Sequence, residues 1–341
     1  KTAYEIRLSL VGSEMCIRDR GQITAQGPNI FTDSTLLNIN GNLVLETNTL
    51  LLDSVNGDIQ VTGTVTADTA DTRALQITAG TGDVIVGNSI GNTPVAGNIG
   101  TLATPLSSLV INSADSVVLP TIFTGTAGLT ITAATIDIAA TQNTTVDSVA
   151  NTPTSISDGS GVVISTTGNA TFAGAVVSAG GIAKNGAGAT TISGKVIATD
   201  NNVTFGGNVT ATDSLFIQAG TGTVTFQPGA TVALGSGNAA ITADEIELPT
   251  GANALTATGG SNTLILQPAT PSVAITIGDV ATDRFNFLGG GCIITDHLPE
   301  PGDSFQRLIL QRFLIQQRAR LGRVYIPHKL THIEGIGAEG V

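Results

Sequence analysis

Short stretches in which apolar and small polar residues alternate fill the chain from residue 21 to residue 283, and this alternation constrains the fold more than any other feature. Runs such as 59–62, 109–112 and 264–267 place an apolar side chain at every second position, and Gly, Asn, Asp or Thr residues separate one run from the next. Period-2 alternation is typical of strands with one buried face. No helical period occurs in this region, so the sequence predicts an all-β body.

Similar phrases recur along this body, which indicates a repeat architecture. The sequence AGTGDV at 79–84 returns as AGTGTV at 219–224. Diverged repetition of short strands is typical of a solenoid. The body has six Phe and no Trp or Tyr, whereas a β-sandwich core usually contains a few large aromatic residues. The fold class predicted for 21–286 is therefore a right-handed parallel β-helix, with roughly 20 to 25 residues per coil and about ten to thirteen coils.

Composition excludes several chemistries from the body. Residues 21–283 contain no His, Cys or Met, and three basic residues against eighteen acidic ones leave a net charge of −15. Imidazole triads, thiol nucleophiles and the usual zinc sites are therefore excluded there. The negative charge disfavours nucleic-acid binding.

Carboxylates are the remaining candidates for chemistry in the body. The densest local cluster is Asp244, Glu245 and Glu247, followed by Asp68 with Asp71. In a strand, residues 245 and 247 share a face while 244 does not, so a Ca²⁺ site needs ligands from an adjacent coil. The simpler interpretation is solvated carboxylates that keep the rod soluble. The sequence identifies no partner for the basic residues Arg73 and Lys184. No catalytic, cofactor-binding or metal-binding residue is predicted, and no cofactor.

The two ends differ from the body. The stretch YEIRLSLVGSEMCIRDR within residues 1–20 resembles a translated sequencing-adapter sequence, so this segment is interpreted as an artefact or a disordered arm. Residues 287–341 form a basic tail, in which a capping-box start at 303–306 predicts a short C-terminal α-helix at about 304–321. Three interpretations of this helix stay open: a membrane or partner-binding element, a cap on the β-stack, or a frameshifted translation. The tail also holds His297, His328 and His332, which we interpret as surface residues and not as metal ligands.

Three stretches of the body resemble known surface proteins. The sequence GGIAKNGAGATTISG at 180–194 resembles the passenger-associated repeat of bacterial autotransporters. Residues 77–84 with 100–112, and 263–271 with 275–278, are similar to strand repeats of filamentous-haemagglutinin-type proteins. This resemblance implies a secreted, β-helical passenger with an adhesive or scaffolding role. Neither the secretion domain nor the outer-membrane barrel of that family occurs in the sequence, so we expect an internal fragment.

The leading hypothesis is a non-enzymatic, adhesin-like structural passenger on the outer-membrane surface of a bacterium or outside the cell. It would make multivalent contacts with extracellular carbohydrate, matrix or neighbouring cells, with no nucleic acid as partner. Membrane contact would occur only through the missing translocation domains, and end-to-end self-association is a further expectation. The alternative is a β-helical polysaccharide lyase or hydrolase, which requires carboxylates and basic side chains from neighbouring coils to converge in a groove.

Overall fold

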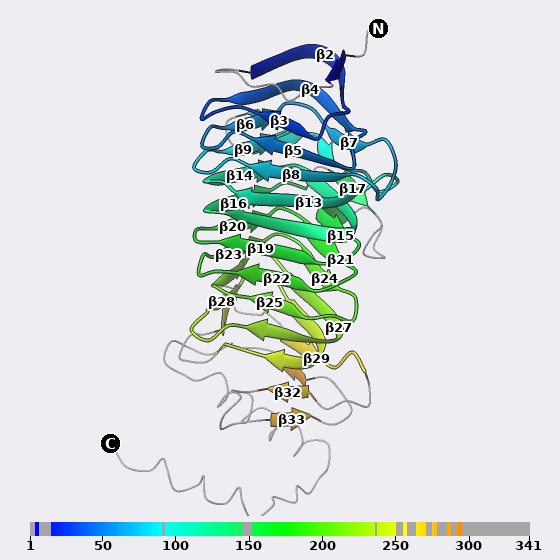
Figure 1. Ribbon diagram of the computed structural model, residues 1–341. Coiled ribbons are helices and arrows are strands. Elements are labelled where there is room, and N and C mark those ends of the chain that lie inside the picture. The colour runs from blue at the N-terminus through cyan, green and yellow to red at the C-terminus, as the bar shows by residue number, and fades with distance from the viewer. Residues whose placement is uncertain are drawn as a thin grey trace, which may run out of the picture.

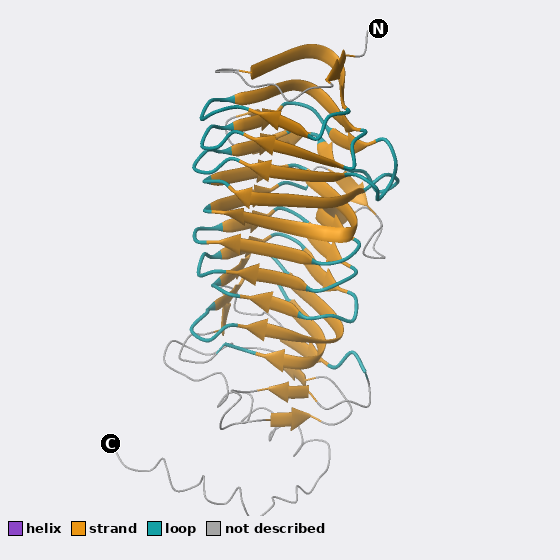
Figure 2. Ribbon diagram, in the orientation of Figure 1, coloured by secondary structure: helices purple, strands orange, loops and turns teal. Residues whose placement is uncertain are grey.

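The chain winds into a stack of parallel coils, about 10 turns in all, seen from the side in Figure 1. The computed structural model describes residues 4–6, 15–90, 93–140, 142–144, 152–235, 237–249, 255–257, 264–270, 275–277, 285–287 and 292–294. It describes side chains within residues 22–87, 97–140, 154–235, 237–249, 255–256 and 264–270. Within these ranges the regular elements are all strands, joined by short loops (Figure 2).

Three parallel ladders of strands run along the stack and give the solenoid three faces. The first face contains β6 (Ile59–Val61), β9 (Val84–Val86), β14 (Ser116–Leu119), β16 (Thr135–Ile138), β20 (Ala170–Phe172), β23 (Thr190–Ile192), β26 (Val209–Ala211), β28 (Val232–Leu234) and β30 (Leu255–Ala257). The second face contains β1 (Tyr4–Ile6), β7 (Val65–Ala67), β12 (Asn98–Ile99), β18 (Thr152–Asp158), β21 (Ala175–Ser178), β24 (Lys195–Ala198) and β31 (Leu264–Gln267). The third face contains β3 (Asn29–Phe31), β5 (Thr49–Asp53), β8 (Ala74–Thr78), β13 (Leu106–Ser113), β19 (Val162–Thr166), β22 (Ile182–Asn185), β25 (Val203–Phe205) and β32 (Ile275–Ile277).

Five long strands bend around a corner and belong to two faces. They are β2 (Met15–Ala25) and β4 (Leu37–Leu45) on the first and second faces, and β15 (Thr121–Ala133), β27 (Leu215–Phe226) and β29 (Ala239–Glu247) on the second and third. Five further strands form four antiparallel pairs: β10 (Asn88–Ile90) with β11 (Thr93–Ala96), β17 (Gln142–Thr144) with β18, β33 (Phe285–Phe287) with β32, and β34 (Cys292–Ile294) with β31.

The length of a coil follows from the register of the ladders. Leu37 pairs with Ile59 on the first face, a spacing of 22 residues, and Ala170 pairs with Thr190, a spacing of 20. Two coils are longer, because Val84 pairs with Val117, 33 residues on, and the coil that starts at Ile136 spans 34. The additional residues include the β10–β11 hairpin and β17, so hairpins are inserted between the first and second faces.

Inward-facing side chains form columns of branched aliphatic residues along the axis. On the second face Ile23, Leu43, Val65, Ile99 and Ile122 follow one another in register, and each is fully buried. Parallel strands stack at about 4.8 Å, so each side chain packs on an identical or similar one from the next coil. A core this narrow needs few aromatic residues, which explains the unusual composition.

Asn and Asp side chains join the turns of successive coils. The Oδ1 atom of Asn42 accepts a hydrogen bond from the backbone N–H of Thr64 on the next coil (3.0 Å). The Oδ1 atom of Asn202 accepts one from the N–H of Thr223 (2.9 Å) in the same way. Turn N–H groups have no ladder partner of their own and must be satisfied, which explains why Asn and Asp recur between the strands.

The structure confirms the predicted all-β class, the parallel solenoid and its short repeats. The predicted right hand of the winding stays a prediction. Residues 304–321 lie outside the described residues, and so does most of the tail, so the C-terminal helix also stays a prediction.

Candidate functional site

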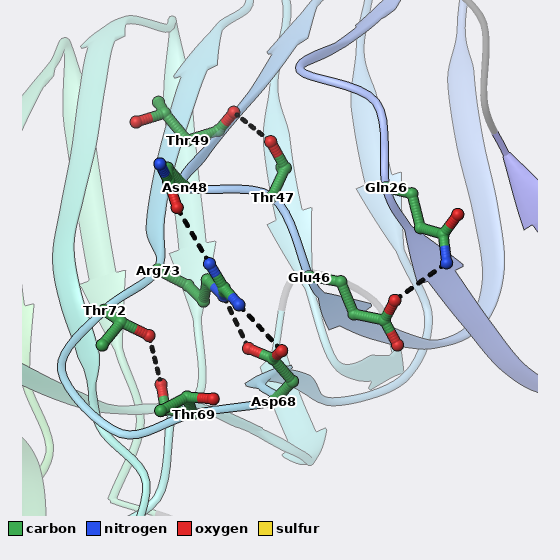
Figure 3. Close-up of polar contacts among 9 residues, drawn as sticks. All are labelled: Gln26, Glu46, Thr47, Asn48, Thr49, Asp68, Thr69, Thr72 and Arg73. Carbon is green, nitrogen blue, oxygen red and sulfur yellow. Dashed lines mark hydrogen bonds and ion pairs between the residues drawn. The ribbon is translucent and has the colours of Figure 1, made fainter.

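The most elaborate polar cluster on the described surface surrounds Arg73 (Figure 3). Arg73 precedes β8, and Asp68 follows β7 in the same turn. The Arg73 Nε and Nη2 atoms donate to the two Asp68 carboxylate oxygens (2.5 and 2.8 Å), and Nη1 donates to Asn48 Oδ1 on the previous coil (2.9 Å). Arg73 therefore does have a partner, although the sequence alone identified none.

Two more polar residues extend this cluster across the preceding coils. Gln26, Glu46 and Asp68 each follow a strand end on the second face, and the Gln26 Nε2 atom donates to Glu46 Oε2 (2.9 Å). The hydrogen bond from Arg73 holds the pKa of Asp68 below its ordinary value, and the same contact raises the pKa of Arg73. All three guanidinium nitrogens donate within the protein, so the cluster fastens the 68–73 turn to its neighbours and leaves no nitrogen unpaired for an anion.

Asp71 does not join this cluster. Its Oδ1 atom accepts a hydrogen bond from the backbone N–H of Thr126 (2.8 Å), and its own N–H donates to the Pro105 carbonyl (2.9 Å). Its φ of 56° lies in the left-handed region, which Asp and Asn tolerate better than most residues. Asp68 and Asp71, which the sequence suggested as one cluster, therefore bind different partners: Asp68 accepts from Arg73 and Asp71 accepts from Thr126.

The three carboxylates at 244–247 are also held apart. Asp244 accepts hydrogen bonds from both the N–H and the Oγ1 of Thr270 (2.8 Å each), whereas Glu245 accepts one from Thr223 Oγ1 (3.2 Å) on the other side. Glu245 and Glu247 both point away from the core, as strand alternation requires. Asp244 and Glu245 contact different neighbouring coils, and the three carboxylates do not converge on a common centre.

The second basic residue of interest, Lys184, lies inside the solenoid. Lys184 occupies an inward position on β22, paired with Ile164 on the previous coil and Phe205 on the next. Its side chain is 2% exposed, and burial lowers the pKa of the ammonium group. A small apolar cavity lies beside it, lined in part by Phe172, Val176 and Ile192.

The ammonium group of Lys184 caps a corner between two faces. Its Nζ donates to the carbonyl oxygen of Gly186 (3.2 Å) and to that of Gly188. In other coils a hydroxyl performs this function: Thr166 Oγ1 donates to the Gly168 carbonyl (3.0 Å), and Ser54 Oγ donates to that of Gly57. Thr166 stacks on Gly186, which has no side chain. Lys184, two residues earlier, therefore supplies the donor from within the core.

A buried carboxylate lies at the corner between the second and third faces. Asp158 is 6% exposed and accepts hydrogen bonds from Thr124 Oγ1 (2.8 Å), the Ser160 N–H (2.9 Å) and Ser178 Oγ (3.0 Å). Thr124, Asp158 and Ser178 are stacked in register on three successive coils. Sequence reasoning missed Asp158 and the buried position of Lys184. Each residue falls on the apolar phase of a strand, and that placement is the signal that could have revealed both.

Two other carboxyl groups with a shifted pKa, those of Asp83 and Asp137, lie apart from each other. Burial raises the pKa of Asp83, and the nearby Asp58 and Asp115 raise it further. Burial also raises the pKa of Asp137 on the outward side of the first face. In the described part of the chain, no three His, Cys, Asp or Glu side chains gather in a way that could hold a metal ion. The three tail histidines lie outside it.

Comparisons with known proteins match no family model, no curated protein and no solved structure. The described residues also include no helix that is long and apolar enough to cross a bilayer.

Proposed function

We propose that this chain is an adhesin-like structural segment of a bacterial surface or secreted protein, which makes many weak contacts along a rigid rod. The observation that carries the proposal is the repetition of small polar side chains at one register on the outward surface. On the first face Thr171, Thr191 and Thr210 point outward from three successive coils, paired in register. Neighbouring coils lie about 4.8 Å apart, so the same chemical group returns at a fixed interval.

The charged residues support the same interpretation. Arg73 donates to Asp68 and Asn48, and Lys184 is enclosed in the core, so both serve the structure of the rod. The outward positions also include Lys195, whose ammonium lies over the Phe216 ring (5.5 Å), and exposed apolar residues such as Val163. The hydroxyl, amide and carboxylate groups beside them form individually weak hydrogen bonds in water. Binding through such groups gains strength from repetition, since linked sites raise avidity without a new contact.

The proposal is tested by alanine substitutions along one column. The variants Thr171→Ala, Thr191→Ala and Thr210→Ala are made singly and together, and the chain is clustered on beads. Adhesion is then measured to a panel of immobilised neutral polysaccharides, a fibrous matrix protein and bacterial cells. We expect each single change to have little effect and the triple change to weaken adhesion several-fold.

A matched control uses the third face, where Thr130, Thr204 and Thr225 also point outward. The triple alanine variant of these residues distinguishes a binding face from a general effect on the rod. If one substitution alone abolishes adhesion, a single specific site replaces the multivalent proposal. Shortening of a polysaccharide by the unaltered chain would contradict it in favour of a β-helical lyase or hydrolase.

A further inference from the structure

Three Asn-Gly pairs occur in the sequence, at residues 40–41, 56–57 and 185–186. An Asn side chain followed by Gly is chemically labile, because glycine has no side chain to hinder attack by its own backbone nitrogen on the neighbouring amide. Asn is accordingly among the thermolabile residues of proteins. Whether a given pair reacts in a folded protein depends on how its amide and its Gly N–H are held.

Two of the pairs are restrained by hydrogen bonds. The Gly57 N–H donates to the Ser54 carbonyl (3.0 Å), and Asn56 Oδ1 accepts a hydrogen bond from the Thr81 N–H (3.4 Å). Asn40 Oδ1 accepts one from Thr62 Oγ1 (3.0 Å), and this pair lies inside the continuous strand β4. Reaction at either pair requires these contacts to break first.

The pair at 185–186 lies at the corner that Lys184 caps. Asn185 and Gly186 are both exposed. Residues at the same corner of other coils donate their backbone N–H to the next coil. The Ser54 N–H donates to the Thr78 carbonyl (3.1 Å), and the Ala79 N–H donates to the Ser113 carbonyl (2.9 Å). Gly186 makes no such bond within the described residues, because the next strand, β25, ends at Phe205 before reaching this register.

We propose that Asn185 is a site of spontaneous deamidation in the folded protein. The Gly186 nitrogen loses its proton to solvent base and attacks Cγ of Asn185, so that a new N–Cγ bond closes a succinimide ring while the Cγ–Nδ2 bond breaks and ammonia leaves. Water then opens the ring at one of its two carbonyl carbons. Attack at Cγ yields aspartate, and attack at the backbone carbonyl carbon yields isoaspartate, in which the chain runs through the side-chain carbon.

Both products alter the corner. Aspartate adds a negative charge to a body that already has a net negative charge. Isoaspartate lengthens the backbone between Lys184 and Gly186 by one carbon, next to the carbonyls that the ammonium group holds. The solenoid therefore contains a position at which its charge and local structure change with age. This inference does not depend on the proposed adhesive function.

The experiment follows the full chain during incubation at mildly alkaline pH. Samples taken over time are digested, and mass spectrometry with fragmentation that separates aspartate from isoaspartate measures conversion at residues 40, 56 and 185. We expect Asn185 to convert several-fold faster than Asn40 and Asn56 in the folded chain. The three rates should approach one another in concentrated denaturant, because the ranking comes from the fold.

Two variants provide an independent readout by isoelectric focusing. Asn185→Gln should remove most of the slow acidic shift of the unaltered chain, since the longer side chain closes a ring much more slowly. Its matched control Asn56→Gln, also in an exposed turn, should leave that shift in place. Equal conversion at the three sites in the folded chain, or an acidic shift that persists in Asn185→Gln, would overturn the proposal.

Discussion

Lys184 is paired in register with Ile164 on the preceding coil, so an ammonium group takes the position of an aliphatic side chain in the inward column of the third face. The column tolerates the replacement because the side chain is long enough for its ammonium group to reach the corner, where it donates to the carbonyl oxygens of Gly186 and Gly188. The methylene groups remain in the core, as is typical of buried lysines.

This placement makes the stability of the solenoid depend on pH in the alkaline range. The pKa of Lys184 in the folded chain lies below its ordinary value of 10.5. Between the two values the unfolded chain binds a proton that the folded chain does not, so the free energy of unfolding rises with pH in that window. Urea unfolding of the unaltered chain and of Lys184→Met at a series of alkaline pH values measures the effect.

The comparison with Lys184→Met isolates this one group, because the other alkaline titrations are common to both proteins. We expect the stability of the unaltered chain to gain on that of Lys184→Met as the pH approaches 10.5. A difference between the two that stays constant with pH would show that Lys184 is not buried as described.

Asp158 tests the polar column between the second and third faces. Asp158→Ala leaves the donors of Thr124, Ser160 and Ser178 without their acceptor inside the protein. Unpaired buried polar groups are costly, so we expect a loss of about 2–4 kcal/mol in the free energy of unfolding. Asp158→Asn retains an acceptor oxygen and should lose less. An Asp158→Ala variant as stable as the unaltered chain would contradict the buried column.

Close stacking of the turns predicts which glycines cannot be replaced. A Cβ atom on Gly188 would lie 1.5 Å from the carbonyl oxygen of Gly168 on the previous coil, whereas one on Gly161 would meet nothing nearer than 3.6 Å. We expect Gly188→Ala to lower stability by about 3 kcal/mol or more. The matched variant Gly161→Ala should change it by less than about 1 kcal/mol. Thermal unfolding of the pair measures the contrast, and equal midpoints would argue against this coil spacing.

The ion pair of Arg73 with Asp68 should contribute little, and only above acid pH. Both side chains are partly exposed, and exposed pairs contribute about 0.2–1 kcal/mol. The pKa of Asp68 lies below its ordinary value of 3.8, so this contribution is present above 3.8 and is lost as the pH falls through the folded pKa. A double-mutant cycle with Arg73→Ala and Asp68→Ala at neutral and acid pH measures it. A coupling that grows on acidification would be inconsistent with the pair.

Much of the fold could be predicted from the sequence because period-2 alternation is a local property. Strand β31 occupies the predicted residues 264–267, and β6 at Ile59–Val61 differs from the predicted 59–62 by one residue. The predicted coil length holds where turns are short. It does not hold for the two coils that contain the β10–β11 hairpin and β17, because the inserted residues lengthen them to 33 and 34 residues. The sequence did not reveal these insertions, since their composition resembles that of the rest of the body.

The polar contacts between coils were less predictable, since they join residues that are distant in sequence. Asp68 lies five residues from Arg73 in the same turn, but Asn48 lies 25 residues away on the previous coil, and that contact depends on the register between coils, which the sequence does not reveal. Asp244 likewise meets Thr270, 26 residues on. By contrast, the inward position of Lys184 follows from alternation with Ile182 and required no knowledge of register.

The proposal of multivalent contact is tested most directly by comparing one presentation of the chain with many. Binding of the single chain and of the same chain clustered on a scaffold is measured against the polysaccharide, matrix and cell panel. The account predicts that clustering raises the apparent affinity by roughly a hundredfold or more, while the single chain binds weakly. Tight binding by the single chain with no gain on clustering would contradict it.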